Sequence, residues 1–239
     1  MSRKKNKLTG EMMMSEKITL NSLNLTEKQK GLVQLAIDND TKIIFISGPA
    51  GSSKTYISVY SALRLLSQYN ELDLIYIRTI IESAEKGLGA LPGGLDEKFN
   101  PYILPLEDKL NEILPTNTTI KKDLINKGRV QAMPINFLRG ADWKSKVVIL
   151  DEAQNATFKE LTTLITRLGE NSKLFICGDI MQSDINGRSG FSGMMDLFND
   201  KESESRGIHT FRFTEEDIKR SEILKYIIRK LSKQWKQKK

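Results

Sequence analysis

The sequence has very little of the chemistry that cysteine and histidine provide. It contains one cysteine, Cys177, and one histidine, His209, in 239 residues. A single cysteine excludes a disulfide bond within the chain, and these two residues alone cannot build a zinc site of cysteine and histidine ligands. Each lies in a strand-like segment without a partner suited to acid–base catalysis, so both are expected to be structural.

Long apolar runs are also missing. No segment is apolar for long enough to cross a bilayer, and the basic N-terminal segment lacks the apolar core of a secretory signal. With 39% hydrophobic and 28% charged residues, the composition is typical of a soluble globular protein. We therefore expect a cytoplasmic protein without a membrane partner, with a flexible basic tail at residues 1–20 and one domain at residues 21–239.

Positive charge is concentrated at the two ends of the chain. Of the net charge of +7, residues 1–10 carry +4 and residues 219–239 carry +8, which leaves −5 for the body between them. Basic ends can bind a polyanion or can simply keep a protein soluble. Charge alone favours the second interpretation.

The segment GPAGSSKT at residues 48–55 resembles a phosphate-binding loop of pattern G-x-x-x-x-G-K-[ST]. Lys54 is expected to neutralise the β- and γ-phosphates of a nucleotide, and Thr55 to bind Mg²⁺. Ser53 replaces the glycine that usually precedes the lysine. Because Ser53 opens a helix, we expect ordinary backbone angles there, with some loss of phosphate approach. A chance match on a strand–helix turn is the alternative.

Two carboxylates follow an apolar segment at residues 147–150. At the carboxyl end of a strand beside the loop, Asp151 would hold Mg²⁺ and Glu152 would accept a proton from the attacking water. The alternative is an acidic helix start after a buried strand. The combination with GPAGSSKT favours the functional interpretation.

Two glutamines are further candidates. Gln182 follows another apolar segment at residues 173–178, where its amide could donate to the γ-phosphate and accept from water. Gln29 precedes the first strand and could pair with adenine, which would favour ATP over GTP. A polar turn is the alternative for Gln182.

The order of elements predicts an α/β fold. Strands are expected at 41–48, 72–79, 130–137, 146–151, 173–178 and 208–213, and helices at 54–66, 157–167 and 215–235. Proline in the segment 130–137 favours a sheet edge. Residues 83–115 hold four of the six prolines and predict a loop-rich excursion with one short helix near 107–114. Strands alternating with helices indicate a parallel sheet between helical layers.

Together these motifs resemble superfamily-one helicase motors and, more closely, the PhoH-like family of ATPases. The resemblance runs from about Leu23 to Arg229. It rests on GPAG-x-x-KT, EKGLGALPGGLDEKFNPY at 85–102, FLRG at 137–140, VVILDEAQN at 147–155, TRLG at 166–169 and GDIMQSDI at 178–185. The segment at 85–102 is the most specific of these motifs.

The resemblance implies a single RecA-like P-loop NTPase domain that binds ATP and Mg²⁺ at the strand ends. The implied catalytic residues are Glu152, Gln182, Lys54 and Arg220, the last as an arginine finger with Arg188 and Arg78 as rivals. The implied metal contacts are Thr55 and Asp151. The implied nucleotide contacts are Gly48, Pro49, Ala50, Gly51, Ser52, Ser53, Lys54, Thr55 and Gln29.

One such domain is too small to be a two-domain translocase, which needs roughly 150 further residues. Work on RNA or single-stranded DNA would then require a homo-oligomer, such as a hexameric ring, in which an arginine completes the neighbouring site. Two hypotheses remain: a Mg²⁺-dependent ATPase acting on RNA or single-stranded DNA, and a nucleotide-dependent switch with little hydrolysis, which Ser53 supports. A nuclease using Asp151, Glu152 and Asp179 is a weaker third.

Overall fold

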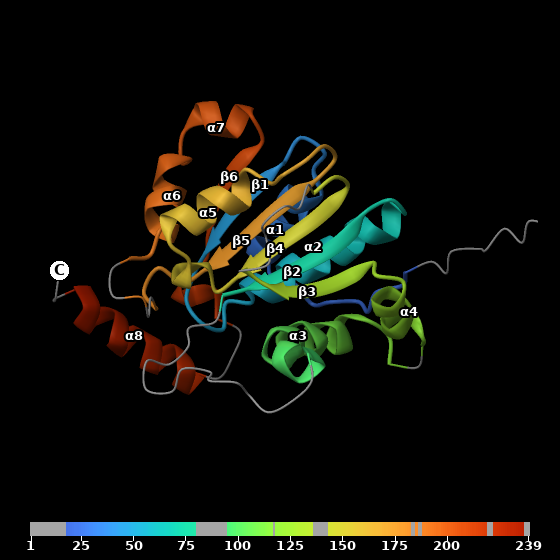
Figure 1. The fold of residues 1–239 in the computed structure, drawn as a ribbon. Coiled ribbons are helices and arrows are strands. Elements are labelled where there is room, and N and C mark those ends of the chain that lie inside the picture. The colour runs from blue at the N-terminus through green and yellow to red at the C-terminus, as the bar shows by residue number, and fades with distance from the viewer. Residues whose placement is uncertain are drawn as a thin grey trace, which may run out of the picture.

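The computed structural model describes residues 18–79, 95–116, 118–135, 143–182, 185, 188–218 and 222–236 (Figure 1). Its strands are β1 (Ile43–Ser47), β2 (Asp73–Arg78), β3 (Val130–Pro134), β4 (Lys146–Asp151), β5 (Lys173–Gly178) and β6 (Ile208–Arg212). Its α-helices are α1 (Glu27–Ile37), α2 (Lys54–Gln68), α3 (Leu95–Ile113), α4 (Ile120–Asn126), α5 (Phe158–Ile165), α6 (Phe191–Leu197), α7 (Lys201–Ser205) and α8 (Glu222–Lys236). The short 3₁₀ helices are η2 (Ala153–Asn155) and η3 (Glu215–Asp217).

The six strands form one sheet in the order β3-β2-β4-β5-β1-β6, and every pairing is parallel. This confirms the predicted α/β fold of the RecA-like P-loop type. Because all strands run in one direction, their carboxyl ends lie along a single edge, where ligands bind in such sheets. β1, β4 and β5, which precede the three candidate motifs, are neighbours at the centre of the sheet.

The sheet lies between two helical layers, as the apolar runs of its central strands predict. One face packs against α1, α2, α3 and α4, and the other packs against α5 and α6 (Figure 1). The first core contains Leu32, Val33, Leu63, Leu66, Leu106 and Leu110. The second contains Leu161, Leu164, Phe191, Met194 and Met195. These two cores hold the central strands rigidly and so fix the positions of the strand ends.

The prediction of an edge strand in the segment at 130–137 is confirmed, although the strand is shorter. β3 is an edge strand, and Pro134 is its last residue, where the missing N–H disturbs the ladder least. The prediction for residues 107–114 is too short, because α3 begins at Leu95 and includes Pro101 and Pro105. Burial of Leu106, Leu110 and Ile113 in the first core stabilises this helix despite the hydrogen bonds that its prolines remove.

The prediction of a helix from residue 215 is wrong at its start. Glu215–Asp217 form η3, and α8 begins at Glu222. Thr214 and Asp217 cap η3 through bonds from the Thr214 N–H and hydroxyl to the Asp217 carboxylate. Helices α1, α4, α6 and α7 were not predicted, since α4, α6 and α7 are too short to show clear apolar periodicity.

Among the described helices, none combines the length and apolar character needed to span a membrane. Several predictions fall outside the described residues: the N-terminal tail up to residue 17, most of the motif EKGLGALPGGL, and the motif FLRG.

Candidate nucleotide-binding site

The loop between β1 and α2 has the shape expected of a phosphate-binding loop. Gly51 has a φ of 82°, a conformation that glycine adopts readily. The buried Ser52 hydroxyl donates to the Pro49 carbonyl oxygen at 2.8 Å, which closes the turn from inside. The first turn of α2 then presents its free backbone N–H groups toward this edge of the sheet, a favourable position for an anion.

The prediction of ordinary backbone angles at Ser53 is wrong. Its φ is 65° and its ψ is 21°, in the left-handed region that favours glycine. A serine there pays a steric cost of about 1–2 kcal/mol because its Cβ approaches the following carbonyl oxygen. The glycine usual at this position is therefore explained by backbone conformation as well as by close approach to phosphate.

Lys54 lies over the loop that precedes it. Its ammonium group donates to the carbonyl oxygens of Gly48 at 2.7 Å and Pro49 at 3.0 Å. These are weak, neutral acceptors for a full positive charge, and a phosphate group is a stronger one. The contacts place the charge at the mouth of the loop, where a bound phosphate would replace them.

Thr55 and Asp151 meet at the carboxyl end of β4. The Thr55 hydroxyl donates to one oxygen of the Asp151 carboxylate at 2.5 Å, and the Tyr76 hydroxyl donates to the other oxygen at 2.5 Å. Tyr76 is fully buried on β2. Burial, together with the adjacent carboxylate, raises the pKa of Tyr76, so its hydroxyl stays protonated and remains a donor.

Glu152 projects from the same strand end by an unusual turn of the backbone, with φ at 57° and ψ at 37°. One carboxylate oxygen lies 3.5 Å from a guanidinium nitrogen of Arg78, and the other accepts from the Gln154 amide at 2.7 Å. The amide oxygen of Gln154 in turn accepts from the backbone N–H of Asp179 at 2.9 Å. Gln154 thus joins the ends of β4 and β5.

Gln182 lies in the turn after β5. Its backbone N–H donates to the Asp179 carbonyl at 3.1 Å, and the Asp179 carboxylate accepts from Met181 N–H at 2.9 Å. Burial raises the pKa of Asp179 above its usual range. The turn holds Gln182 at the carboxyl edge of the sheet.

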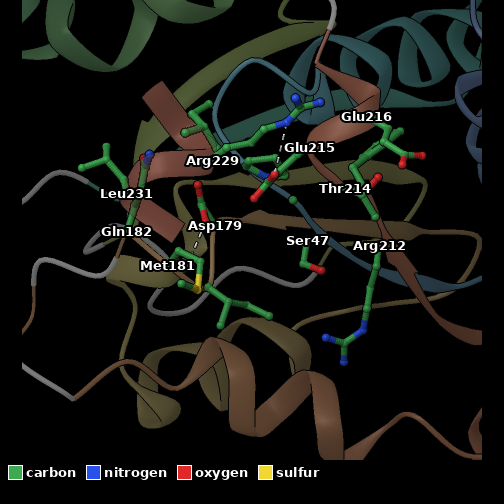
Figure 2. A pocket seen from close by; sticks show the side chains of 15 residues that line it. Ser47, Asp179, Met181, Gln182, Arg212, Thr214, Glu215, Glu216, Arg229 and Leu231 are labelled. Carbon is green, nitrogen blue, oxygen red and sulfur yellow. Dashed lines mark hydrogen bonds and ion pairs between the residues drawn. The ribbon is translucent and has the colours of Figure 1, made fainter. Parts of the chain in front are cut away.

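Two adjacent cavities occupy this edge of the sheet. The loop cavity has a volume of about 540 Å³ and includes Lys54, Thr55, Arg78, Asp151, Glu152, Gln154 and Gln182 in its lining. The β6 cavity, of about 740 Å³, lies between Gly48 and Pro49 on one side and η3 and α8 on the other. Figure 2 shows Arg212, Glu215, Arg229 and Leu231 around it. Asp179 and Gln182 line both cavities. The structure therefore brings Lys54, Thr55, Asp151, Glu152 and Gln182 together.

A family model described as "PhoH-like protein" matches residues 23–232. The chain belongs to the PhoH-like family. A PhoH-like protein of Mycobacterium bovis is 34% identical over 230 residues, which cover 92% of this chain and 63% of that relative. A PhoH-like protein of Bacillus subtilis is 33% identical over 235 residues, covering 97% of this chain and 72% of that protein. The chain thus spans less than two thirds of its mycobacterial relative.

A solved structure shows the same fold at low sequence similarity. The large terminase of a thermophilic bacteriophage aligns with 84% of the PhoH-like chain and 48% of its own, with a TM-score of 0.50 and 11% identity. Such a likeness supports the fold assignment alone.

Gln29 and Arg188, which were both expected at the site, line neither cavity. Gln29 is buried in a capping box of α1, where Thr26 and Gln29 bond each other's backbone N–H groups, and it lines neither cavity. Adenine contact would require its amide to leave this cap, so that role stays a prediction. Arg188 is exposed and also lines neither cavity. Arg220 lies outside the described residues.

The oxygen atoms of Thr55 and Asp151 fit a Mg²⁺ site. Mg²⁺ is commonly held by one or two protein oxygens together with phosphate and water. Within the described ranges, no group of three or more histidine, cysteine or acidic residues could hold a metal by itself. Asp151, Glu152 and Asp179 therefore do not form the metal cluster that a nuclease would need.

Sequence reasoning missed Tyr76 and Gln154 in this PhoH-like site. Tyr76 lies in the middle of an apolar strand, so the sequence indicates only a core position for its ring. No neighbouring residue in the sequence indicates a role for its hydroxyl. Gln154 stands in the quoted motif VVILDEAQN, and its position two residues after Glu152 was the available signal. Both act through contacts across neighbouring strands, which only the folded sheet creates.

Proposed function

We propose that this PhoH-like chain binds ATP with Mg²⁺ and hydrolyses the β–γ phosphoanhydride bond. The observation that carries the proposal is the convergence of Lys54, Asp151, Glu152 and Gln182 on one cavity from three separate segments of sequence. Mg²⁺, when bound to Thr55 and Asp151, would neutralise charge on the phosphates. Phosphoryl transfer needs chiefly such positioning and charge stabilisation.

Each residue of the loop cavity has a role that follows from its chemistry. Lys54 binds the β- and γ-phosphates, and the backbone N–H groups of Gly51, Ser53, Lys54 and Thr55 surround them. Glu152 accepts a proton from the attacking water, while Gln154 holds its second oxygen in place. Gln182 orients that water against the γ-phosphate. The buried Tyr76 hydroxyl donates to the Asp151 carboxylate and fixes its position.

We also propose that ATP hydrolysis is coupled to work on RNA or single-stranded DNA. The chain would act as a cytoplasmic homo-oligomer such as a hexameric ring. The basic ends of the chain support a polyanionic partner. An apolar stripe on α8 supports assembly, because Ile223, Tyr226, Ile227 and Leu231 are all exposed in the single chain. Arg220, as a finger reaching a neighbouring site, remains part of this proposal.

A second candidate is a nucleotide-dependent switch with little turnover. The left-handed backbone of Ser53 favours it, because strain in the loop can weaken the approach to phosphate. The two candidates predict the same ligand and differ in phosphate release.

Phosphate release with MgATP, measured with and without single-stranded RNA, tests the proposal. We expect release from the natural chain, loss of release with retained ATP binding in Glu152→Gln, and loss of binding in Lys54→Ala. Glu71→Gln, an exposed residue in the turn before β2, is the matched control and should behave as the natural chain. ATP binding without release under any condition would establish the switch, and failure to bind MgATP would contradict both candidates.

A further inference from the structure

Arg78 occupies a position from which it can reach a nucleotide in its own chain. It is the last residue of β2, and it lies in register with Asp151 of β4. Because the two strands are parallel, their ends emerge at the same edge of the sheet. The Arg78 side chain lines the loop cavity together with Lys54 and Thr55, and it is 27% exposed.

The guanidinium group of Arg78 is only lightly engaged. Within the described part of the chain its one hydrogen bond goes to a Glu152 oxygen at 3.5 Å, which is a long contact. Guanidinium carries five N–H donors, so most of its capacity remains for a ligand in the cavity. Glu152 does not depend on this contact, because Gln154 holds its other oxygen at 2.7 Å.

We propose that Arg78 is a catalytic residue that binds the γ-phosphate of ATP within its own chain. This inference rests on the proposed ATP site. When ATP enters the loop cavity, its γ-phosphate offers the guanidinium a second anion with several acceptor oxygens. Arg78 then exchanges Glu152 for phosphate, which frees one Glu152 oxygen to accept a proton.

After this exchange, Arg78 and Glu152 have different roles in the hydrolysis step. The water oxygen forms a bond to the γ-phosphorus, and the bond from this phosphorus to the β–γ bridging oxygen breaks. The bridging oxygen leaves with ADP and keeps the electron pair. One proton of the water passes to Glu152, the other remains on the released phosphate, and Arg78 neutralises charge on the γ-oxygens.

Other described arginines near this edge are less suited to the role. Arg212 lines the β6 cavity and pairs with Asp196 at 3.1 Å. Arg229 lines the same cavity and lies 3.8 Å from Glu215. Figure 2 marks this ion pair with a dashed line. Neither they nor the exposed Arg188 lines the loop cavity. Among the described arginines, Arg78 is thus the one that shares this cavity with Lys54 and Glu152.

The first test compares nucleotides that differ in the γ-phosphate. Affinities of ADP and of the β,γ-imido analogue of ATP are measured for the natural chain, Arg78→Ala and the control Arg206→Ala, which changes an exposed arginine that lines neither cavity. We expect Arg78→Ala to weaken the analogue at least tenfold while changing ADP less than twofold. Equal weakening of both nucleotides, or of neither, would overturn the inference, and this readout does not require hydrolysis.

The second test measures turnover and separates action within a chain from action between chains. Removal of a phosphate-binding arginine commonly lowers turnover by about 10³-fold or more. We expect a fall of at least about 100-fold in Arg78→Ala and none in Arg206→Ala. Mixing Arg78→Ala with Lys54→Ala chains should restore no activity, because neither chain has a complete site. Recovery in the mixture would show that Arg78 serves a neighbour and would overturn the assignment.

Two further outcomes would also contradict the inference. If Arg78 only positions Glu152, Arg78→Ala would lower turnover with the preference for the ATP analogue over ADP unchanged. If Arg78 binds nucleic acid, Arg78→Ala would lose stimulation by RNA and keep its basal rate. A natural chain that binds the analogue without any phosphate release would defeat the proposed hydrolysis and leave the affinity comparison as the deciding measurement.

Discussion

Ser53 illustrates how one side chain can change a phosphate-binding loop without removing any functional group. Lys54 and Thr55 follow it in place, and the loop keeps its closing bond from Ser52 to Pro49. What changes is the energy of the backbone, because the left-handed angles at Ser53 suit glycine better than serine.

Replacement of Ser53 by glycine should raise the free energy of unfolding by about 1 kcal/mol, since it relieves the left-handed strain at a smaller cost in chain entropy. ATP affinity should also rise, because the loop can approach phosphate more closely. The matched control is Ser145→Gly, which changes the same residue type at a φ of 52°, at a position that lines neither cavity. Denaturant titration and calorimetry with MgATP measure both effects.

The control should gain stability and leave ATP affinity unchanged. A loss of stability in Ser53→Gly would show that the serine hydroxyl contributes more than its backbone angles cost.

Tyr76 acts on the metal-binding carboxylate from the core side. Tyr76→Phe removes the donor to a buried Asp151 oxygen and should lower the free energy of unfolding by about 1–3 kcal/mol. The Mg²⁺ concentration needed for half-maximal ATP binding should increase, because the carboxylate loses one of its two restraints. Tyr69→Phe removes only an exposed hydroxyl, 3.4 Å from Asn39, and should change neither quantity. An unchanged Mg²⁺ requirement in Tyr76→Phe would contradict this positioning role.

At the scale of elements, buried polar contacts join helices to the sheet. Lys173 begins β5, and its ammonium group donates to the carbonyl oxygens of Asp38 and Thr41 beyond the end of α1. Burial is the main cause that lowers the pKa of Lys173 to about 8, with Lys42 adding repulsion. The contact fixes the end of α1 beside the strands that form the site.

This pKa predicts a pH dependence of stability. The unfolded chain binds the proton of Lys173 with a pKa of 10.5, so between about pH 8 and 10.5 it holds more protons than the folded chain. The contribution of Lys173 to the free energy of unfolding therefore rises with pH across this window. Denaturant titrations at pH 7.5 and 9.5 should show a smaller rise in Lys173→Met than in the natural chain. Lys122→Met, which changes an exposed lysine of α4, should keep the full rise; equal behaviour of the two variants would refute the assignment.

At the scale of the whole molecule, α8 leaves several apolar side chains exposed. Ile228 is buried and lines the β6 cavity, while Ile223, Tyr226 and Ile227 are exposed. A basic amphipathic helix in this state is expected to find a partner surface, and the proposed oligomer provides one.

Ile227→Asp should therefore reduce the molecular mass in solution to that of one chain, because a buried charge at the contact is costly. Its melting temperature without assembly should change little, since Ile227 is already 44% exposed. Leu197→Asp on α6, 59% exposed, is the matched control and should leave the mass unchanged. Light scattering during gel filtration measures the mass. A natural chain that is monomeric with and without ATP would contradict assembly.

The sequence by itself determined the fold class and several of the residues that line the loop cavity. Apolar strands that end in Gly48, Asp151 and Gly178 must be parallel and central, and their carboxyl ends must then meet, so local pattern was sufficient for Lys54, Asp151 and Gln182. The range of α3 and the start of α8 were decided by packing and capping, which override the signals of proline and periodicity.

Only the tertiary structure decided how the residues of the site support one another. The bond from Tyr76 to Asp151, the link from Glu152 through Gln154 to Asp179, and the place of Arg78 all join strands that are distant in sequence. The left-handed turn at Ser53 likewise follows from how β1 enters α2. Sequence patterns report the local period and composition of a chain, whereas these contacts depend on the register of neighbouring strands.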